Sequence, residues 1–175
     1  MLCLALVPLA VVLGTGCGNK EEKTSGDEGE LVHVGEAVYQ VQLTRLLNPH
    51  QRPDDSYVRG QPTLPADEQY LAVFLTIKNE GEEDYSPPRD MRVVDTEGNQ
   101  YLPLNATQTG FGLDFAEQIP PGDESPPPNS PAAEGPEEAA LLLFRVKTAS
   151  ATENLPVMLE VPDGNGKTSR IRLDV

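Results

Sequence analysis

Gln-Tyr-Leu-Ala-Val-Phe-Leu-Thr-Ile-Lys-Asn, residues 69–79, is the stretch of the chain that decides the fold. Its aliphatic residues alternate, and in a β-strand they would share one face: Leu71, Val73, Leu75 and Ile77. The opposite face begins apolar at Tyr70 and becomes polar at Thr76 and Lys78. We therefore predict a strand that is buried on one face and covered on the other only near its first end.

Two short apolar runs follow this strand. Met91–Asp95 and Gln100–Leu104 flank the turn residues Thr96–Asn99. Runs of this length around a Gly/Asn turn are typical of a β-hairpin. We interpret residues 69–104 as a central meander that forms the core of a β-sandwich.

The rest of the chain repeats this pattern of short alternating runs. Proline and glycine are frequent, at 17 and 15 of 175 residues, and no long helical pattern occurs, so strands joined by turns are favoured over a helical bundle. The predicted strands cover residues 37–46, 69–79, 90–95, 100–104, 138–147, 156–161 and 168–174. About seven strands at this spacing predict an all-β fold, an immunoglobulin-like antiparallel β-sandwich.

The chain is strongly acidic, with 28 Asp and Glu against 13 Lys and Arg and a formal net charge of −15. A field of this sign repels nucleic-acid phosphates and anionic lipid headgroups, so we expect no nucleic-acid partner and no basic membrane-binding patch. Solubility is a sufficient reason for such a charge, although cations and basic partners are compatible with it.

The amino terminus has the features of an export signal. Met1–Gly16 contains no charged residue, and its apolar block is shorter than the roughly 20 residues that a membrane-spanning helix needs. Small residues then precede a cysteine in Gly14–Cys17, which resembles the lipobox of bacterial lipoproteins. That resemblance implies removal of residues 1–16, acylation of Cys17 and a location at the extracytoplasmic face of the bacterial cell membrane. A signal without lipidation and an uncleaved anchor are the alternatives.

Residues 17–30 are predicted to be an acidic, flexible tether between this anchor and a domain over residues 31–175. Gly18–Glu30 has no aliphatic or aromatic residue, so it would bury too little surface to offset the entropy of ordering it. Cys3 would leave with the signal and Cys17 would carry the lipid. The domain would then contain no disulfide and no cysteine nucleophile.

A long polar connection, Asn48–Ala66, is the first candidate interaction site. It gathers acidic, basic and aromatic side chains within ten residues: His50, Arg52, Asp54, Asp55, Tyr57 and Arg59. Long connections without secondary structure are disproportionately functional, so this loop is a candidate for contact with a protein partner. Alternatively, the loop is packed by its own Tyr and Pro side chains and held by Arg–Asp pairs.

The second candidate loop is Ile119–Pro136, which has seven prolines in eighteen residues. Such a run resists both a hydrogen-bonded ladder and a helix. We interpret it as a stiff crossover between the two sheets, and a ligand for a proline-reading domain is the alternative. Residues 105–118 ahead of it are predicted to form a loop held by aromatic side chains.

The sequence offers little for catalysis. It has no Gly-x-Ser-x-Gly, and its only histidines are His33 and His50, so a serine-hydrolase triad is not indicated. Zinc-ligand spacing is also missing, and we expect no metal, no cofactor and no enzyme activity. The acidic turn Glu82–Asp84 leaves a weak calcium site open as an alternative. Asp163–Lys167 departs from a calcium loop and is predicted to be a hairpin turn.

Three segments taken together carry a family resemblance: Tyr70–Asn79, Val94–Tyr101 with its Asp-x-x-Gly-x-x-Tyr hairpin, and Leu142–Val146. They resemble the DUF4352 family, immunoglobulin-like modules of Gram-positive surface lipoproteins. The resemblance covers about residues 31–175 and implies no catalytic residues. We expect a membrane-anchored lipoprotein whose domain binds an unidentified cell-surface protein. A small-ligand or calcium sensor is the alternative.

Overall fold

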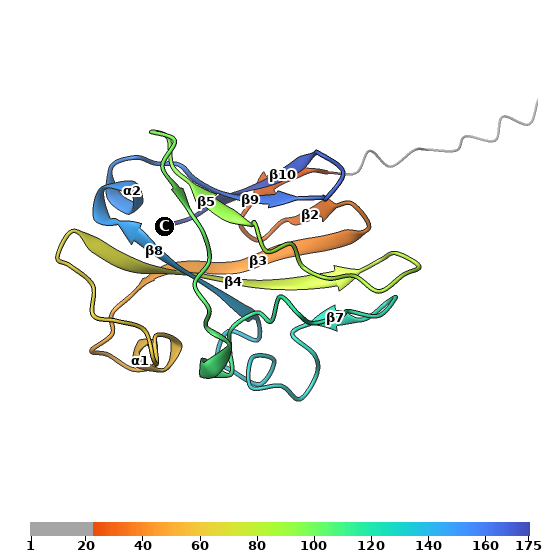
Figure 1. Cartoon of the computed structure of the whole chain (residues 1–175), viewed down its shortest axis with the longest axis horizontal. Coiled ribbons are helices and arrows are strands. Elements are labelled where there is room, and N and C mark those ends of the chain that lie inside the picture. Colours follow the sequence, from red (N-terminus) through yellow and green to blue (C-terminus); the bar gives the residue numbers. More distant parts are fainter. Residues whose placement is uncertain (1–22) are drawn as a thin grey trace, which may run out of the picture.

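The computed structural model describes residues 23–175, so the predicted signal and Cys17 lie outside the described residues. The described chain forms a β-sandwich of two sheets (Figure 1). The first sheet contains, in spatial order, β1 (Ser25–Asp27), β10 (Thr168–Leu173), β9 (Val157–Pro162), β5 (Arg92–Val94) and β6 (Gln100–Tyr101). The second contains β2 (Leu31–Val34), β3 (Ala37–Leu47) and β4 (Glu68–Asn79), with β7 (Glu124–Ser125) and β8 (Ala140–Lys147) along the far edge of β4.

Helical structure is limited to short turns. These are α1 (Asp54–Tyr57), α2 (Thr148–Thr152) and a 3₁₀ turn at Thr107–Thr109. Between residues 23 and 175, no helix is long and apolar enough to cross a membrane. The predicted all-β sandwich is therefore confirmed, although it has more strands than predicted.

The inner face of β4 packs against the first sheet. Leu71, Val73, Leu75 and Ile77 are all buried there, as their alternation predicts. Apolar side chains from both sheets complete this core, among them Val41, Leu142, Phe144, Leu159, Val161 and Ile171. Each fully buried side chain of this kind contributes about 1.5–3 kcal/mol relative to an exposed one, so this layer is the main source of stability.

The outer face of β4 is covered by loops instead of a sheet. Tyr70 and Phe74 are buried in a second apolar cluster to which the loop residues Tyr57 and Phe111 belong. Lys78, at the other end of the strand, is exposed. The prediction that this face is covered only near its first end is confirmed.

The amino-terminal part of the domain differs from the prediction. Ser25–Asp27, predicted as part of the tether, forms β1 and pairs in parallel with β10. Its sequence Ser-Gly-Asp has no apolar alternation that would predict a strand. The strand is held instead by backbone pairing and by an ion pair from Asp27 to Arg172 at 2.9 Å. β2 is likewise absent from the predicted strands, although Val32 and Val34 alternate on the core side.

The predicted meander is wrong in its layering. β4 belongs to the second sheet and the β5–β6 hairpin to the first, so the chain crosses the sandwich between Asn79 and Arg92. It crosses back directly after β6, because the Leu104 N–H donates to the Leu143 carbonyl in β8 at 2.7 Å. Residues 90–95 and 100–104 do form the predicted hairpin, with shorter strands.

The proline-rich segment is also not the crossover that we predict from its sequence. Ile119 already exchanges backbone hydrogen bonds with Tyr85, and β7 within the segment pairs with Ile77 and Lys78 of β4. The segment therefore runs along the second sheet. The predicted loop over residues 105–118 does contain a helical turn, and Phe111 holds it to the outer cluster.

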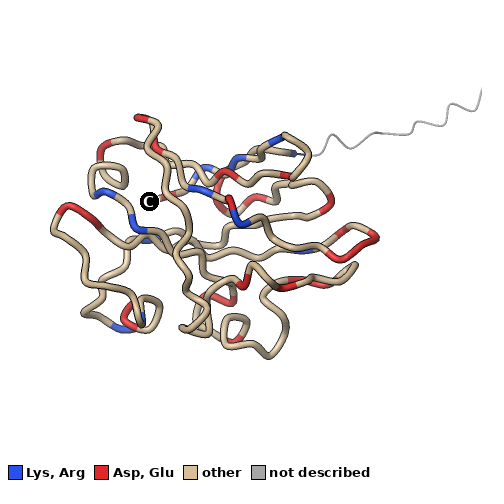
Figure 2. Tube along the Cα trace, in the orientation of Figure 1, with Lys and Arg blue, Asp and Glu red and all other residues tan. Residues whose placement is uncertain are grey.

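The two ends of the sandwich differ in their charges. The turns at the end where β4 finishes carry many acidic residues (Figure 2). These turns are Gly35–Glu36 between β2 and β3, Glu80–Asp84 after β4, and Asp163–Lys167 between β9 and β10. We call this the acidic end. The opposite end carries α1, α2 and the 48–66 loop (Figure 1).

Candidate functional site

The 48–66 loop is built around one buried aromatic ring. Tyr57 closes α1 and packs edge-on against Phe74 of β4 and against Phe111, with ring centroids 5.0 Å apart in both pairs. Tyr57 is fully buried and its hydroxyl has no hydrogen-bond partner. Burial therefore raises the pKa of Tyr57. This residue anchors the loop and does not face a partner.

One arginine joins this loop to the second candidate loop. Arg45 on β3 lies 3.0 Å from the Asp54 carboxylate at the start of α1 and 3.2 Å from the Glu137 carboxylate. Its guanidinium also lies over the rings of Tyr57 and Phe74, at 5.6 and 5.7 Å from their centroids. Arg45 thus holds both loops to the outer face of the sheet by charge and by cation–π contact.

The six predicted residues of the loop fall into two groups. Tyr57 and Asp54 are committed to the fold through the contacts above, as the alternative interpretation of the loop expects. The other four are exposed: His50, Arg52, Asp55 and Arg59. The arginine that pairs with Asp54 comes from β3 and not from the loop itself. The sequence gives no sign that Arg45 also pairs with Glu137, because these two residues are remote from each other in the chain.

A cavity of about 270 Å³ lies under the loop. Leu47, Val58 and Leu64 give it apolar walls, and His50 and Gln69 contribute polar groups. The Tyr70 hydroxyl donates to the Pro62 carbonyl and so ties the descending part of the loop to β4. Of the predicted residues, His50 alone lines the cavity.

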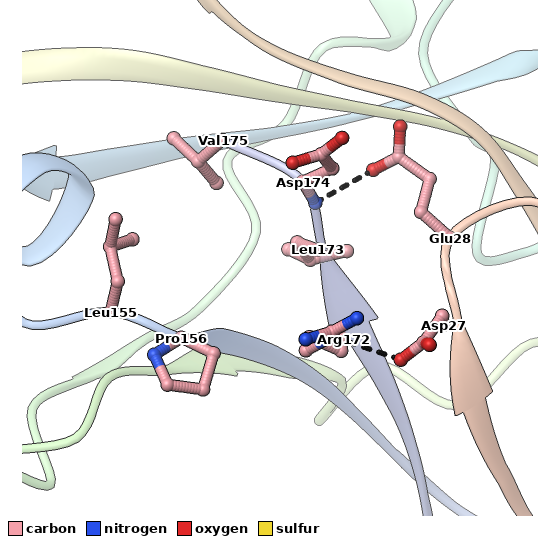
Figure 3. A pocket seen from close by; sticks show the side chains of 8 residues that line it. All are labelled: Asp27, Glu28, Leu155, Pro156, Arg172, Leu173, Asp174 and Val175. Carbon is pink, nitrogen blue, oxygen red and sulfur yellow. Dashed lines mark hydrogen bonds and ion pairs between the residues drawn. The ribbon is translucent and has the colours of Figure 1, made fainter.

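A larger hollow, of about 530 Å³, lies beside the end of β10 (Figure 3). Two of its carboxylates are already used by the fold: Asp27 pairs with Arg172, and Glu28 accepts the backbone N–H groups of Thr44 at 3.0 Å and Asp174 at 3.1 Å. These contacts tie β1 to both sheets. Because Asp27 and Glu28 are held by these contacts, neither carboxylate is free to bind a ligand in the hollow.

Asp95 is the centre of a buried polar network at the turn of the β5–β6 hairpin. It is 5% exposed, and its carboxylate accepts the backbone N–H groups of Glu97 at 3.0 Å and Asn99 at 2.9 Å. Ser150 of α2 donates to Asp95 at 2.6 Å, and the Tyr101 hydroxyl lies 2.7 Å from the Ser150 hydroxyl. Because Ser150 gives its proton to Asp95, Tyr101 donates to Ser150.

The ionisation of Asp95 follows from these contacts. Burial alone would raise the pKa of Asp95, but the hydrogen bonds from Ser150, Asn99 and Asn154 outweigh it and lower the pKa to about 2. The carboxylate is therefore charged at neutral pH and is a weak proton acceptor. We call this cluster the Asp95 latch, because it joins the β5–β6 hairpin to α2. It gives a physical reason for the Asp-x-x-Gly-x-x-Tyr spacing, in which Gly98 has a left-handed conformation at φ +81°.

The acidic turns of the described chain do not combine into one possible cation site. Among residues 23–175, no group of three or more His, Cys, Asp or Glu side chains is placed to hold a metal ion. Glu82, Glu83 and Asp84 are exposed. Asp163 accepts the backbone N–H groups of Asn165 and Lys167, as its predicted role in a hairpin turn requires.

Comparison with known proteins identifies the fold. No family model and no curated protein matches the chain. Solved structures do match it, and one is the yjhA protein from Bacillus subtilis, with 15% identity, a TM-score of 0.55, and coverage of 85% of this chain and 99% of that one. A secreted protein from Mycobacterium tuberculosis, MPT63, shows 15% identity, a TM-score of 0.53, and coverage of 89% and 99%.

An uncharacterized β-sandwich protein from Clostridium difficile 630 is similar to the same extent. It shows 14% identity, a TM-score of 0.51, and coverage of 89% of this chain and 97% of that one. The structural similarity extends over nearly the whole length of each of these proteins. What the chain shares with these bacterial proteins is the β-sandwich fold.

Proposed function

We propose that this protein is an extracytoplasmic, non-catalytic interaction module, held at the membrane by a lipid on Cys17, which binds a protein partner through the 48–66 loop. The observation that carries this proposal is the cavity of about 270 Å³ under the loop. Small-molecule sites usually enclose about 300–1,000 Å³. A cavity slightly below this range suits one or two apolar side chains of a protein better than a free ligand.

The exposed charges around the loop support the same proposal. Arg52 and Arg59 are exposed, and neither belongs to an ion pair with another described residue. Arginine is enriched at protein interfaces, where its planar group pairs with carboxylates. A partner with an apolar side chain beside an acidic residue would suit this surface.

The absence of catalysis is part of the proposal. The hydroxyl of Ser150 donates to the Asp95 carboxylate, with no histidine in the described network that would take a proton from it. The low pKa of Asp95 also makes it a poor base. His50 and His33 lie in other parts of the fold, at the 48–66 loop and in β2.

Membership of the DUF4352 family is also a proposal. It is supported by the Asp95, Gly98 and Tyr101 spacing, which the latch explains, and by fold likeness to bacterial sandwich proteins. It would be supported further if sequences that share this spacing also carried a serine at the position of Ser150.

Site-specific photo-crosslinking in the native membrane tests the interaction surface. A crosslinker at His50 or Arg59 should give one discrete adduct, and a crosslinker at Asn165 of the acidic end should not. Deleting the loop is a poorer test, because the deletion would remove Tyr57 from the outer cluster. A substitution in the cavity wall, Leu64→Glu, should abolish the adduct while Lys167→Glu leaves it intact. Equal adducts from all three crosslinker positions would refute the assignment of the loop.

A further inference from the structure

Lys23, the first residue that the structure describes, is already held on the sandwich. The Lys23 carbonyl accepts the His33 N–H at 2.8 Å, and the Thr24 carbonyl accepts the Arg170 N–H at 3.1 Å. Lys23 also forms an ion pair with Glu30 at 2.6 Å. The chain is therefore already held on the sandwich at Lys23, well before the predicted domain boundary at residue 31.

This point lies at the acidic end. Thr24 lines a small hollow together with Gly35 and with Asp163 and Lys167 of the β9–β10 turn. The turn before β3 lies next to the end of β4, since the Glu80 N–H donates to the Glu36 carbonyl at 2.9 Å. Figure 1 shows the 48–66 loop and α1 at the opposite end of the long strands.

Covalent geometry then limits the distance between the proposed lipid and the domain. Lys23 lies six residue steps after Cys17, and an extended chain spans at most about 3.6 Å per step, or about 22 Å in all. β4 alone has 12 residues, which at about 3.3 Å each correspond to about 40 Å. A tether of this length cannot reach from a membrane at the 48–66 loop to Lys23 at the other end.

We infer that the anchored domain stands with its acidic end toward the lipid surface and its 48–66 loop farthest from it. This inference rests on the proposed anchoring at Cys17. The end that faces the bilayer carries three lysines, Lys23, Lys78 and Lys167, and a larger number of acidic residues: Glu36, Glu80, Glu82, Glu83, Asp84, Asp123, Glu124 and Asp163. The Asp123 carbonyl accepts the Asn79 N–H at 3.0 Å, which places this residue beside the end of β4.

The charges decide how closely the domain approaches the bilayer. Anionic headgroups repel this acidic end, and the repulsion acts over a Debye length of about 8 Å at physiological ionic strength. The domain is therefore held away from anionic membranes, within the limit set by the length of chain between Cys17 and Lys23. Added salt or a zwitterionic surface removes this repulsion and brings the acidic end closer, without reversing the orientation.

Energy transfer from single cysteine labels to headgroup acceptors tests the inference. The chain has no cysteine after Cys17, so Asn165→Cys and Arg59→Cys each add one labelling position to the full chain, purified from membranes and reconstituted in vesicles. Both positions are exposed. We expect strong transfer from position 165 and weak transfer from position 59. On vesicles that contain anionic lipid, transfer from position 165 should rise with salt. Equal or reversed transfer would overturn the inference.

The mass of the intact protein separates this inference from the proposal on which it rests. A diacylated Cys17 at the amino terminus supports the anchor, and an unmodified Cys17 refutes the anchor. In the second case the free thiol of Cys17 can be joined to a maleimide lipid, and a fluorescent unnatural residue at position 165 or 59, in place of the cysteine label, then tests the orientation directly. Unequal transfer under those conditions would uphold the geometry although the natural anchor had failed.

Discussion

Phe74 and Leu75 are neighbours on β4, yet they belong to different kinds of packing. Leu75 faces a mainly aliphatic core between two sheets, and Phe74 faces a layer of loops held by aromatic rings and by Arg45. The inner core is formed by strands that pair through regular backbone hydrogen bonds. The outer layer depends on a few individual contacts between distant segments. We therefore expect the inner layer to determine global unfolding and the outer layer to open locally.

The largest effect is expected from the inner layer. Leu75→Ala removes a fully buried side chain from the core, and substitutions of this kind cost about 2–5 kcal/mol of unfolding free energy. Denaturant titration measures the loss. Lys78→Ala on the exposed part of the same strand is the control, with a change below about 0.5 kcal/mol. Similar losses from both variants would contradict the burial difference along β4.

The second effect concerns the Asp95 latch at the end of the inner layer. The folded pKa of about 2 lies below the ordinary value of 3.8, so the charged form stabilises the fold above pH 4. This contribution, about 2 kcal/mol, is lost as the pH falls from 4 to 2. Asp95→Asn should reduce stability at pH 7 and remove this part of the pH dependence. If the stability curves of the parent protein and of Asp95→Asn stayed parallel between pH 2 and pH 5, this role of Asp95 would be contradicted.

The third effect probes the outer layer. Arg45→Met would leave the Asp54 and Glu137 carboxylates, only 13% and 18% exposed, without their shared cation. Since Arg45 is itself 30% exposed, the loss should lie between that of surface and buried ion pairs, at about 1–2 kcal/mol. Hydrogen exchange should accelerate in the 48–66 loop and not in β4. Uniform acceleration would show that the two layers open together.

The smallest effect has the opposite sign. Tyr57→Phe removes a buried hydroxyl that has no hydrogen-bond partner and keeps the ring contacts with Phe74 and Phe111. An unpaired buried polar group is destabilising, so the variant should be as stable as the parent or up to about 1 kcal/mol more stable. Thermal melting measures this, with Tyr57→Ala as the disruptive control. A clear loss from Tyr57→Phe would indicate an unrecognised partner for the hydroxyl.

The two layers also differ in how far the sequence predicts them. Alternation on residues 69–79 identifies both faces of β4, and the change to Thr76 and Lys78 predicts the limit of the outer cover. Periodicity succeeds here because strand pairing imposes a period of two on every side chain. It cannot say which sheet a strand joins, and so the meander of residues 69–104 is assigned to the wrong layers.

The candidate site was less predictable. Composition marks the 48–66 loop as unusual, but it does not distinguish Tyr57, which is buried, from Arg59, which is exposed. The contact of Arg45 with Glu137 has no local signal, because it forms only after both loops fold over the sheet. β1 is hidden for a related reason, since its polar residues are ordered by pairing with the last strand of the chain.

The parallel pairing of β1 with β10 has a mechanical consequence. Ser25, Gly26 and Asp27 pair with Arg170, Ile171 and Arg172, and the hydrogen bonds of such a ladder run across the strands. A pull on the amino terminus, resisted by a load at the 48–66 loop, acts along the strand axis. All bonds of the ladder then share the force at once and do not open one after another. The first strand of the domain is thus a clamp for tension along the molecule.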